Sequence, residues 1–245
     1  MSVAPDAPHT KSDSFYFRQL LSGRDFATTD PIARQMVNFA YIIGDRNTGE
    51  CVIVDPAYAA SELVSIAAQD DMSVVGALAS HYHADHIGGS MMGFSLKGID
   101  ELLDQIDVPV HINRHEREWV MKTTGVDESS LVLHEDGDIV RVGTIDIALV
   151  HTPGHTPGSQ CFLVQNRLVS GDTLFLDGCG RTDLPGSDPS AMYTSLRKLA
   201  TLSTDTMIHP GHFYSPQESD KLESVLRHNF VFGPRTQDEW SSLFG

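Results

Sequence analysis

Seven histidine and aspartate side chains, spread over four short segments, have the types and spacing of metal ligands. Four of them stand in the six-residue stretch HYHADH, namely His81, His83, Asp85 and His86. Three imidazoles and a carboxylate this close together have no packing rationale in a dry core. Neutral imidazole and carboxylate are strong ligands for zinc and iron(II). The stretch therefore predicts a metal-binding loop.

Three more candidate ligands lie farther along the chain in a similar local setting. His155 stands in HTPGHTPGS, Asp172 ends LVSGD, and His212 stands in IHPGH. Each follows apolar residues of strand type, as HYHADH does. In layered α/β folds, the loops beyond strand C-termini line the crevice where ligands bind. We therefore expect the four segments to meet on one rim of the fold.

The size of this ligand set favours two metal ions. Seven groups exceed the four ligands of a structural zinc site, and none of them is a thiolate. Such a set suits two metals about 3.5–4 Å apart, with a carboxylate bridge and a shared hydroxide. Metal binding lowers the pKa of the shared water to near neutrality, which supplies a nucleophile for a carbonyl carbon. We expect two divalent ions, with zinc as the first choice and iron or manganese as alternatives.

The remaining histidines are expected to be structural, because an isolated histidine packs or hydrogen-bonds more often than it binds metal. They are His9, His111, His115, His134, His151, His209 and His228. Cys179 is interpreted in the same way, as a small buried side chain. The three cysteines are widely spaced and form no Cys-x-x-Cys motif, which excludes a disulfide framework and a zinc ribbon.

The amino-acid composition excludes several classes of binding partner. The 245 residues include 17 Lys and Arg against 33 Asp and Glu, a net charge of −16 that repels nucleic acid and anionic membranes. Residues 1–14 lack the basic and apolar regions of a signal peptide and are predicted to form a flexible tail. No apolar run reaches the roughly 20 residues that span a bilayer. The sequence favours a cytoplasmic protein with a small-molecule or carrier-bound substrate.

Alternating strand and helix patterns predict one α/β domain over residues 15–245. In the first half we expect a hairpin of residues 37–45 and 50–57, a helix at 60–69, a strand at 73–80, a helix at 95–106, a strand at 108–113 and a helix at 114–123. In the second half we expect strands at 143–154, 159–164, 167–172 and 204–211. Two helices should begin at Pro189 and Pro216, capped by Asp188 and Ser215.

The motif set resembles that of the metallo-β-lactamase fold superfamily, with HYHADH, TPGHTPGS, SGDTLF and PGH between about residues 37 and 214. The resemblance implies an α/β fold, specifically a four-layer αβ/βα sandwich of two mixed sheets with outer helices and metals at one edge. It implies two metal positions, the first held by His81, His83 and His155 and the second by Asp85, His86 and His212, with Asp172 bridging. Asp85 would also serve in catalysis by accepting a proton. Asp55, in VDPA, would lie beside the site.

Within this superfamily the sequence resembles two groups. The segment GDTLFLDGCGRTDLPGSDP is similar to glyoxalase II-like hydrolases, including stand-alone thioesterases, and implies hydrolysis of a thioester. The shorter GCGRTD is also similar to persulfide dioxygenases, which use one iron at the positions of His81, His155 and Asp172. Leu184 departs from those dioxygenases, which tend to have an aromatic residue there. A catalytically silent metal-binding module is a third interpretation, against which the intact ligand set argues.

Departures from other members narrow the choice. The Asp85–His86 pair and the aspartate at position 172 argue against β-lactam hydrolysis. The short segment after His212 argues against the glutathione-binding helical domain of glyoxalase II. Residues 91–107 resemble an insertion, in which Met91, Met92, Phe94 and Leu96 would form either an apolar lip for an acyl chain or part of a helix that caps the core. We therefore expect a metal-dependent thioester hydrolase, with the iron-dependent persulfide dioxygenase as the alternative.

Overall fold

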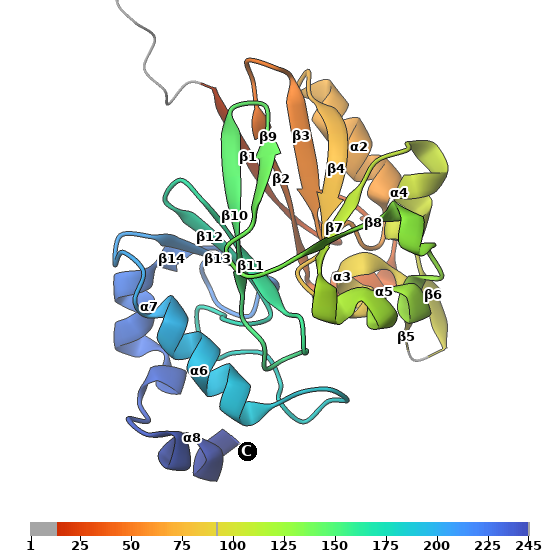
Figure 1. The fold of residues 1–245 in the computed structure, drawn as a ribbon. Helices are drawn as coiled ribbons and strands as arrows, with labels where there is room; N and C mark the ends of the chain where they lie inside the picture. The colour runs from red at the N-terminus through yellow and green to blue at the C-terminus, as the bar shows by residue number, and fades with distance from the viewer. Residues whose placement is uncertain (1–13, 92, 245) are drawn as a thin grey trace, which may run out of the picture.

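The protein is built around two six-stranded sheets that pack face to face (Figure 1). The computed structural model describes residues 14–91 and 93–244, and the following statements concern those residues. Both sheets are mixed: antiparallel hairpins are joined to parallel pairs, such as the one that β12 makes with β13. The expected α/β fold class with two mixed sheets is therefore confirmed.

The first sheet has the strand order β1-β2-β3-β4-β7-β8, and the second has the order β14-β13-β12-β11-β10-β9. The strands of the first sheet are β1 (Phe15–Leu21), β2 (Phe39–Asp45), β3 (Glu50–Val54), β4 (Ser73–Leu78), β7 (Val110–Asn113) and β8 (Leu131–His134). Those of the second are β9 (Ile139–Val142), β10 (Ile145–His151), β11 (Gln160–Val164), β12 (Arg167–Gly171), β13 (Met207–Pro210) and β14 (Asp220–Lys221). A separate small hairpin pairs β5 (Gly89–Met91) with β6 (Phe94–Leu96).

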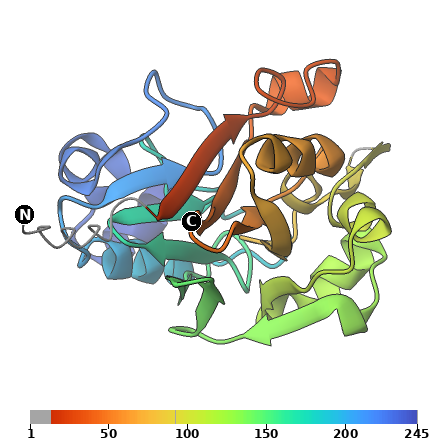
Figure 2. The same ribbon diagram turned by 90° about the horizontal axis from the view of Figure 1, so that it is seen from above.

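Helices cover the outer face of each sheet, as Figures 1 and 2 show. Beside the first sheet lie α1 (Pro31–Met36), α2 (Ala60–Gln69), α3 (Ala84–Ile87), α4 (Ile99–Gln105) and α5 (Arg117–Thr124). Beside the second lie α6 (Pro189–Leu199), α7 (Leu222–His228) and α8 (Gln237–Phe244). Short 3₁₀ turns are formed by Arg114–Glu116, Glu128–Ser130 and Phe230–Phe232. The order helix, sheet, sheet, helix is the expected four-layer sandwich.

Three apolar clusters hold the layers together. The cluster between the sheets includes Phe39, Leu78 and Phe162, each at most 1% exposed. A second cluster, with Leu63 of α2, joins the first sheet to its helices. A third, with Trp240 of α8, joins the second sheet to α6 and α7. Because both faces of each sheet are buried, the central strands are almost continuously apolar, and this is why β2 and β3 are apolar along most of their length.

The helix predicted to begin at Pro216 begins six residues later than its capping signal suggested. Asp220 and Lys221 form β14, which pairs with Ile208 and Met207 at the edge of the second sheet. The helix starts only at Leu222. Backbone pairing with an open sheet edge therefore outweighs the local Ser-Pro signal. The equivalent signal at Asp188 and Pro189 is confirmed, because Asp188 accepts from the backbone N–H groups of Ser190 and Ala191.

The predicted helix at 95–106 is also shorter than expected. Phe94–Leu96 belong to the small hairpin, and the helix runs from Ile99 to Gln105. Gly98 separates them, since a Cβ there would lie 2.1 Å from the carbonyl oxygen of Ile87. This close approach needs glycine.

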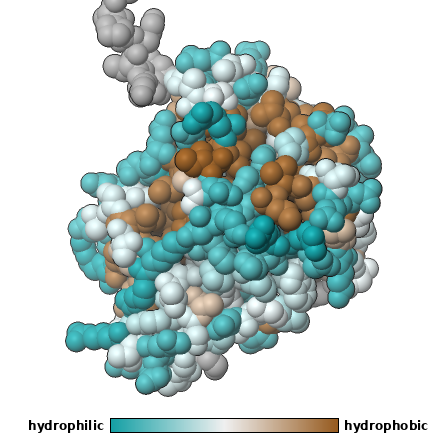
Figure 3. Space-filling view, viewed as in Figure 1, coloured by the Kyte–Doolittle hydropathy of each residue, from teal (hydrophilic) through white to brown (hydrophobic). Residues whose placement is uncertain are grey.

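The tail expected at residues 1–14 lies outside the described residues except for Ser14, whose carbonyl accepts from the N–H of Arg46. Exposed apolar side chains are few, and Figure 3 shows a mainly polar face with separate apolar groups in its upper half. Among the described residues, no helix combines the length and apolar character that crossing a membrane requires.

Candidate metal centre

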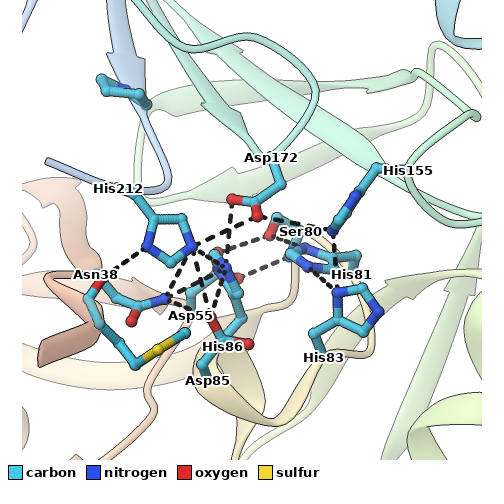
Figure 4. Close-up of polar contacts among 12 residues, drawn as sticks. Asn38, Asp55, Ser80, His81, His83, Asp85, His86, His155, Asp172 and His212 are labelled. Atoms are coloured by element: carbon cyan, nitrogen blue, oxygen red, sulfur yellow. Dashed lines mark hydrogen bonds and ion pairs between the residues drawn. The ribbon is translucent and has the colours of Figure 1, made fainter. Parts of the chain in front are cut away.

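The structure brings all seven candidate ligands together on one rim of the sandwich (Figure 4). HYHADH follows β4 of the first sheet and continues into the short helix α3. His155, Asp172 and His212 follow β10, β12 and β13 of the second sheet. Both sheets therefore contribute, and each contributes from the C-terminal ends of strands, as the sequence predicted.

Three of the ligand candidates form an all-imidazole set, here called the three-histidine group: His81, His83 and His155. His83 Nδ1 lies 3.1 Å from His81 Nε2 and 3.0 Å from His155 Nε2. The side chains of His81 and His155 are almost fully buried, whereas His83 is partly exposed.

The second set, here called the mixed group, consists of Asp85, His86 and His212. The two imidazole Nε2 atoms are 3.2 Å apart. Asp85 Oδ2 lies 3.7 Å from His86 Nε2 and 3.4 Å from His212 Nε2. Around an ion with bonds of about 2.1 Å, neighbouring ligand atoms are about 3.0–3.6 Å apart, so both sets have the spacing of ligands.

Asp172 lies between the two groups. Its Oδ1 is 3.3 Å from His86 Nε2, and its Oδ2 is 3.4 Å from His212 Nε2 and 3.6 Å from His155 Nε2. Oδ1 is buried and has no hydrogen-bond partner within residues 14–91 and 93–244. Gly211 allows this approach, because a Cβ there would lie 2.4 Å from Oδ1. A buried carboxylate oxygen without a donor is suited to a cation.

Hydrogen bonds on the outer nitrogens of the mixed group fix where its protons are. His86 Nδ1 donates to Asp55 Oδ2 at 2.9 Å, and His212 Nδ1 donates to the carbonyl oxygen of Met36 at 2.9 Å. A carbonyl or ionised carboxylate oxygen can only accept, so each Nδ1 carries the proton. The inner Nε2 atoms of His86 and His212 are therefore lone-pair acceptors that face each other.

The same reasoning applies to the three-histidine group. His155 Nδ1 donates to the carbonyl oxygen of Arg181 at 2.8 Å. Ser80 Oγ donates to Asp55 Oδ2 at 2.6 Å, so it accepts from His81 Nδ1 at 2.9 Å. The inner Nε2 atoms of His81 and His155 thus also present lone pairs. Lone pairs gathered at about 3 Å repel one another unless a cation lies among them, so these residues fit a metal centre.

Charge differs between the two groups. Burial, and then the neighbouring imidazole of His155, lowers the pKa of His83 to about 4, and burial and the nearby imidazoles keep the pKa of His81 well below its usual value. Burial disfavours the charged form of His86, but Asp172 and Asp85 outweigh it and raise the pKa of His86 well above its usual value. Burial and neighbouring imidazoles thus disfavour protonation of His81 and His83, whereas the carboxylates of the mixed group favour protons or a cation at His86.

The carboxylates of the centre stay ionised. Burial alone would raise the pKa of Asp172, but His212 and His86 hold it well below its usual range. His86 and His212 likewise lower the pKa of Asp85 against its burial. Two buried anions surrounded by imidazoles create a strong local preference for positive charge, which bound divalent ions supply more effectively than protons.

Asp55, which the sequence placed beside the site, supports both groups from outside. Its Oδ1 accepts from the N–H of Ser80 at 2.7 Å, while its Oδ2 accepts from Ser80 Oγ and His86 Nδ1. Its backbone has φ = 55°, a strained conformation for a residue with a side chain. The structure thus holds Asp55 in an unfavourable conformation that aims its carboxylate at His86.

Sequence reasoning missed three supporting residues. Asn38 and Tyr58 form a hydrogen-bonded pair next to the mixed group, with Tyr58 Oη donating to Asn38 Oδ1 at 2.8 Å. Glu116 is buried beneath the loop of His155 and accepts from Thr156 Oγ1 and from the N–H of Gly158. None of the three stands next to a candidate ligand in the sequence, so spacing alone could not identify them.

The histidines expected to be structural make local contacts outside the centre. His111 and His134 share a hydrogen bond of 2.8 Å, His115 stacks on His151, and His209 contacts Gln19. His228 lies close to the carbonyl of Ser224 in α7, and His9 lies outside the described residues. Cys179 is partly buried, and burial raises the pKa of its thiol to about 12, so the thiol stays protonated.

A cavity of about 510 Å³ opens over the centre. Five of the candidate ligands line its floor: His83, Asp85, His155, Asp172 and His212. The walls are formed by Met36, Phe175, Asp177, Gly178, Cys179, Gly180, Arg181, Leu184, Tyr214 and Phe230. Of the two alternatives for this segment, the apolar lip is wrong for Met91, Phe94 and Leu96, because none of these three lines the cavity. Leu96 is buried in the core and Phe94 points to solvent as part of the small hairpin. Met92 lies outside the described residues.

A four-layer sandwich with a His- and Asp-rich centre below an open cavity defines a class of metal-binding α/β protein. Residues 34–212 match the metallo-beta-lactamase superfamily. The chain belongs to this superfamily, as its motifs predicted.

Three similar proteins illustrate the range of this superfamily. The hydroxyacylglutathione hydrolase of Salmonella typhi is 35% identical over 192 residues, which cover 78% of this chain and 68% of that protein. The probable polyketide biosynthesis zinc-dependent hydrolase BaeB of Bacillus velezensis is 28% identical over 201 residues, covering 80% and 81%. The crystal structure of ETHE1 from Myxococcus xanthus matches with a TM-score of 0.75 at 28% identity, covering 94% of this chain and 89% of that one.

Proposed function

We propose that this protein is a metal-dependent hydrolase that cleaves a thioester at a centre of two divalent ions, with zinc as the expected metal. The observation that carries the proposal is the convergence of four imidazole lone pairs and two ionised carboxylates beneath an open cavity. The three-histidine group would hold one ion, the mixed group the other, and Asp172 would bridge them. The names of two similar proteins support this chemistry: one is a zinc-dependent hydrolase, and the other acts on an acylglutathione, which is a thioester.

When bound, the ions would supply a hydroxide nucleophile and polarise the thioester carbonyl. The residues of the chain do the rest. Asp172 faces both groups, so its carboxylate would fix the position of one group relative to the other. Asp85 lines the cavity, and its carboxylate would accept the proton that the attacking water releases. Returning this proton to the leaving sulfur would complete hydrolysis.

The walls of the cavity indicate the kind of substrate. Met36, Phe175, Leu184 and Phe230 are apolar, and Tyr214 stacks on the ring of His212. The guanidinium of Arg181 is paired with Asp183 rather than free to bind a substrate anion. This lining supports a small-molecule or carrier-bound thioester with an apolar acyl group, rather than a strongly anionic substrate.

A second candidate uses part of the same centre. A mononuclear iron enzyme that oxidises a thiol persulfide with oxygen would employ His81, His155 and Asp172. The segment that carries this resemblance, Gly178–Asp183, contacts two of these residues: the N–H of Gly180 donates to the Asp172 carbonyl, and the Arg181 carbonyl accepts from His155. These two contacts are the reason to test the dioxygenase chemistry directly.

One preparation tests both candidates. Protein purified without added metal is analysed for zinc, iron and manganese, and is then assayed with acylglutathione and acylpantetheine thioesters and, in an oxygen electrode, with glutathione persulfide. We expect two metal equivalents and thioester turnover without oxygen uptake. A single iron with persulfide-dependent oxygen uptake would replace the proposal with the second candidate. Two metals without any thioester turnover would refute the choice of substrate.

A further inference from the structure

The buried side chain of Asn38 lies against the mixed group. Asn38 stands between α1 and β2 and is 3% exposed. Its backbone is held on both sides, because its carbonyl accepts from the N–H of Ser22 and its residue forms an isolated β-bridge with His212. The side chain therefore starts from a fixed point next to one of the candidate ligands. Figure 4 shows it reaching from the left toward His86 and Asp85.

The amide nitrogen of Asn38 contacts every member of the mixed group. Nδ2 lies 3.1 Å from Asp85 Oδ2, 3.3 Å from His86 Nε2 and 3.4 Å from His212 Nε2. The distances among those three atoms are 3.2, 3.4 and 3.7 Å. The terminal atom of Asn38 therefore has the spacing of a further ligand atom around the same point.

An amide N–H₂ group cannot bind a metal ion, because it is a donor only. It also uses the lone pairs of His86 and His212 that an ion would need, so the N–H₂ group and an ion compete for the same atoms. Rotation of the amide by 180° exchanges Nδ2 for Oδ1, and a carbonyl oxygen is a metal ligand. An amide side chain has this choice, and its two orientations have nearly the same shape.

Tyr58 makes both orientations possible. In the present orientation its hydroxyl donates to Asn38 Oδ1 at 2.8 Å. After rotation the same hydroxyl would accept from Nδ2, since a phenol both donates and accepts. Desolvation by burial raises the pKa of Tyr58 far above its usual value, so the hydroxyl keeps its proton. In both orientations the amide of Asn38 and the hydroxyl of Tyr58 share a hydrogen bond.

We propose that Asn38 is a reversible ligand of the second metal position. When an ion is held by Asp85, His86 and His212, the side chain turns Oδ1 toward it. Without an ion, the side chain turns Nδ2 toward the same three residues. The inference rests on the proposed metal centre. Because amide oxygen is a hard ligand, Asn38 should make this position discriminate less between zinc and manganese or iron(II) than the three-histidine group does. The three-histidine group has no such neighbour among the described residues, so the effect is confined to one of the two positions.

Metal titrations of Asn38 variants test this proposal. Purified metal-free wild type, Asn38→Ala and Asn38→Asp are titrated with Mn²⁺ and, separately, with Zn²⁺ in a calorimeter. In Asn38→Ala we expect the second equivalent of Mn²⁺ to bind at least about tenfold more weakly and the first to change less than twofold. Asn38→Asp, which restores an oxygen ligand, should bind the second equivalent at least as tightly as wild type. Tyr16→Phe, which removes a hydroxyl from β1 far from the centre, is the control for folding.

A direct readout follows the rotation itself. The side-chain amide signals of Asn38, assigned by their absence in Asn38→Ala, are recorded by ¹⁵N NMR while Zn²⁺ is added. They should move with the second equivalent and not with the first. Unchanged signals, or a second equivalent that binds Asn38→Ala as tightly as wild type, would refute the role of Asn38 while leaving the two-ion centre intact. Wild type that binds only one ion would refute both.

Discussion

The two halves of the centre differ in what surrounds their ligand atoms. In the three-histidine group, the imidazoles of His81 and His155 are fixed by hydrogen bonds to Ser80 and to a backbone carbonyl, and burial lowers the pKa of His81 well below its usual value. The mixed group contains an ionised carboxylate, an imidazole with a raised pKa and the movable amide of Asn38. One position is therefore set before an ion arrives, whereas the other exchanges protons and hydrogen bonds for an ion.

This difference predicts an order of binding. An ion that enters the three-histidine group breaks only the contacts that its three imidazoles make with one another. An ion that enters the mixed group displaces the contacts of Asn38 and competes with protons for His86, whose pKa is raised. Binding to the first position should thus be tighter and less dependent on pH. The following variants test this contrast.

The largest effect is expected for Asp172→Ala, because Asp172 is the one candidate ligand that faces both groups. Its loss should weaken both metal positions and remove several kcal/mol of transition-state stabilisation, which corresponds to a thioesterase rate lower by about a thousandfold or more. Elemental analysis after dialysis and a thioester assay measure the two effects. Retention of two metals by this variant would show that the groups do not depend on a shared carboxylate.

His212→Ala and His83→Ala form a matched pair that separates the two positions. His212→Ala removes one imidazole from the mixed group, so one metal per chain should remain. His83→Ala removes the imidazole that contacts both other members of the three-histidine group and should cost the tighter ion. Stoichiometry by elemental analysis distinguishes them. Full activity in His212→Ala with one metal bound would favour the mononuclear mechanism.

Asp55→Asn should have a smaller and more selective effect. Asparagine tolerates the positive φ of this position, so the backbone is not disturbed. If the amide nitrogen takes the place of Oδ2, however, it cannot accept the proton of His86 Nδ1. The proton of His86 would then move to Nε2 and block ligation. We expect the affinity for the second ion to fall about 10- to 100-fold, which a calorimetric titration measures.

The first ion provides the internal control for Asp55→Asn. Asp55 contacts His86 directly but reaches His81 only through the hydroxyl of Ser80. The first equivalent should therefore change much less than the second. Equal losses at both positions would mean that Ser80 transmits the change and that the two groups are not independent.

The candidate ligands could be predicted from the sequence because each of them stands in a short local motif. A histidine or aspartate after an apolar strand marks a rim position, and the four segments meet as that rule requires. The helix at Ala60–Gln69 was also predicted at both ends, since its apolar spacing is regular and no sheet edge competes for it. The family resemblance supplied the layer order, which periodicity alone does not contain.

What could not be predicted depends on contacts between distant segments. Asn38 lies 47 positions from Asp85 and 174 from His212, and an asparagine after a helix is also a common cap. The failed capping signal at Ser215 has the same origin, because β13 recruits the residues that follow it. The cavity walls have the same origin: Phe175 and Phe230 line the cavity, and the Met91 hairpin, which the sequence offered as one possible lip, does not.

The smallest effect on metal binding is expected at Glu116, which supports the loop of the three-histidine group. Burial raises the pKa of this carboxyl to about 7, although Thr156 and Gly158 donate hydrogen bonds to it. The folded state therefore binds a proton more tightly than the unfolded state, so the carboxyl destabilises the fold as pH rises from about 4.5 to 7. Glu116→Gln keeps an oxygen acceptor and carries no charge. It should raise the free energy of unfolding above pH 7 by up to about 3 kcal/mol and leave it nearly unchanged near pH 5.

Urea unfolding at pH 5.5 and 8 measures this gain, and metal titration of the same variant relates it to the two positions. If the three-histidine group is set by hydrogen bonds rather than by charge, the first equivalent should bind Glu116→Gln as it binds wild type at both pH values. A pH-dependent change in that affinity would mean that the charge of Glu116 reaches His155 through the loop. The three-histidine group would then respond to pH in the same way as the mixed group, and the distinction between a preset and an adjustable position would be lost.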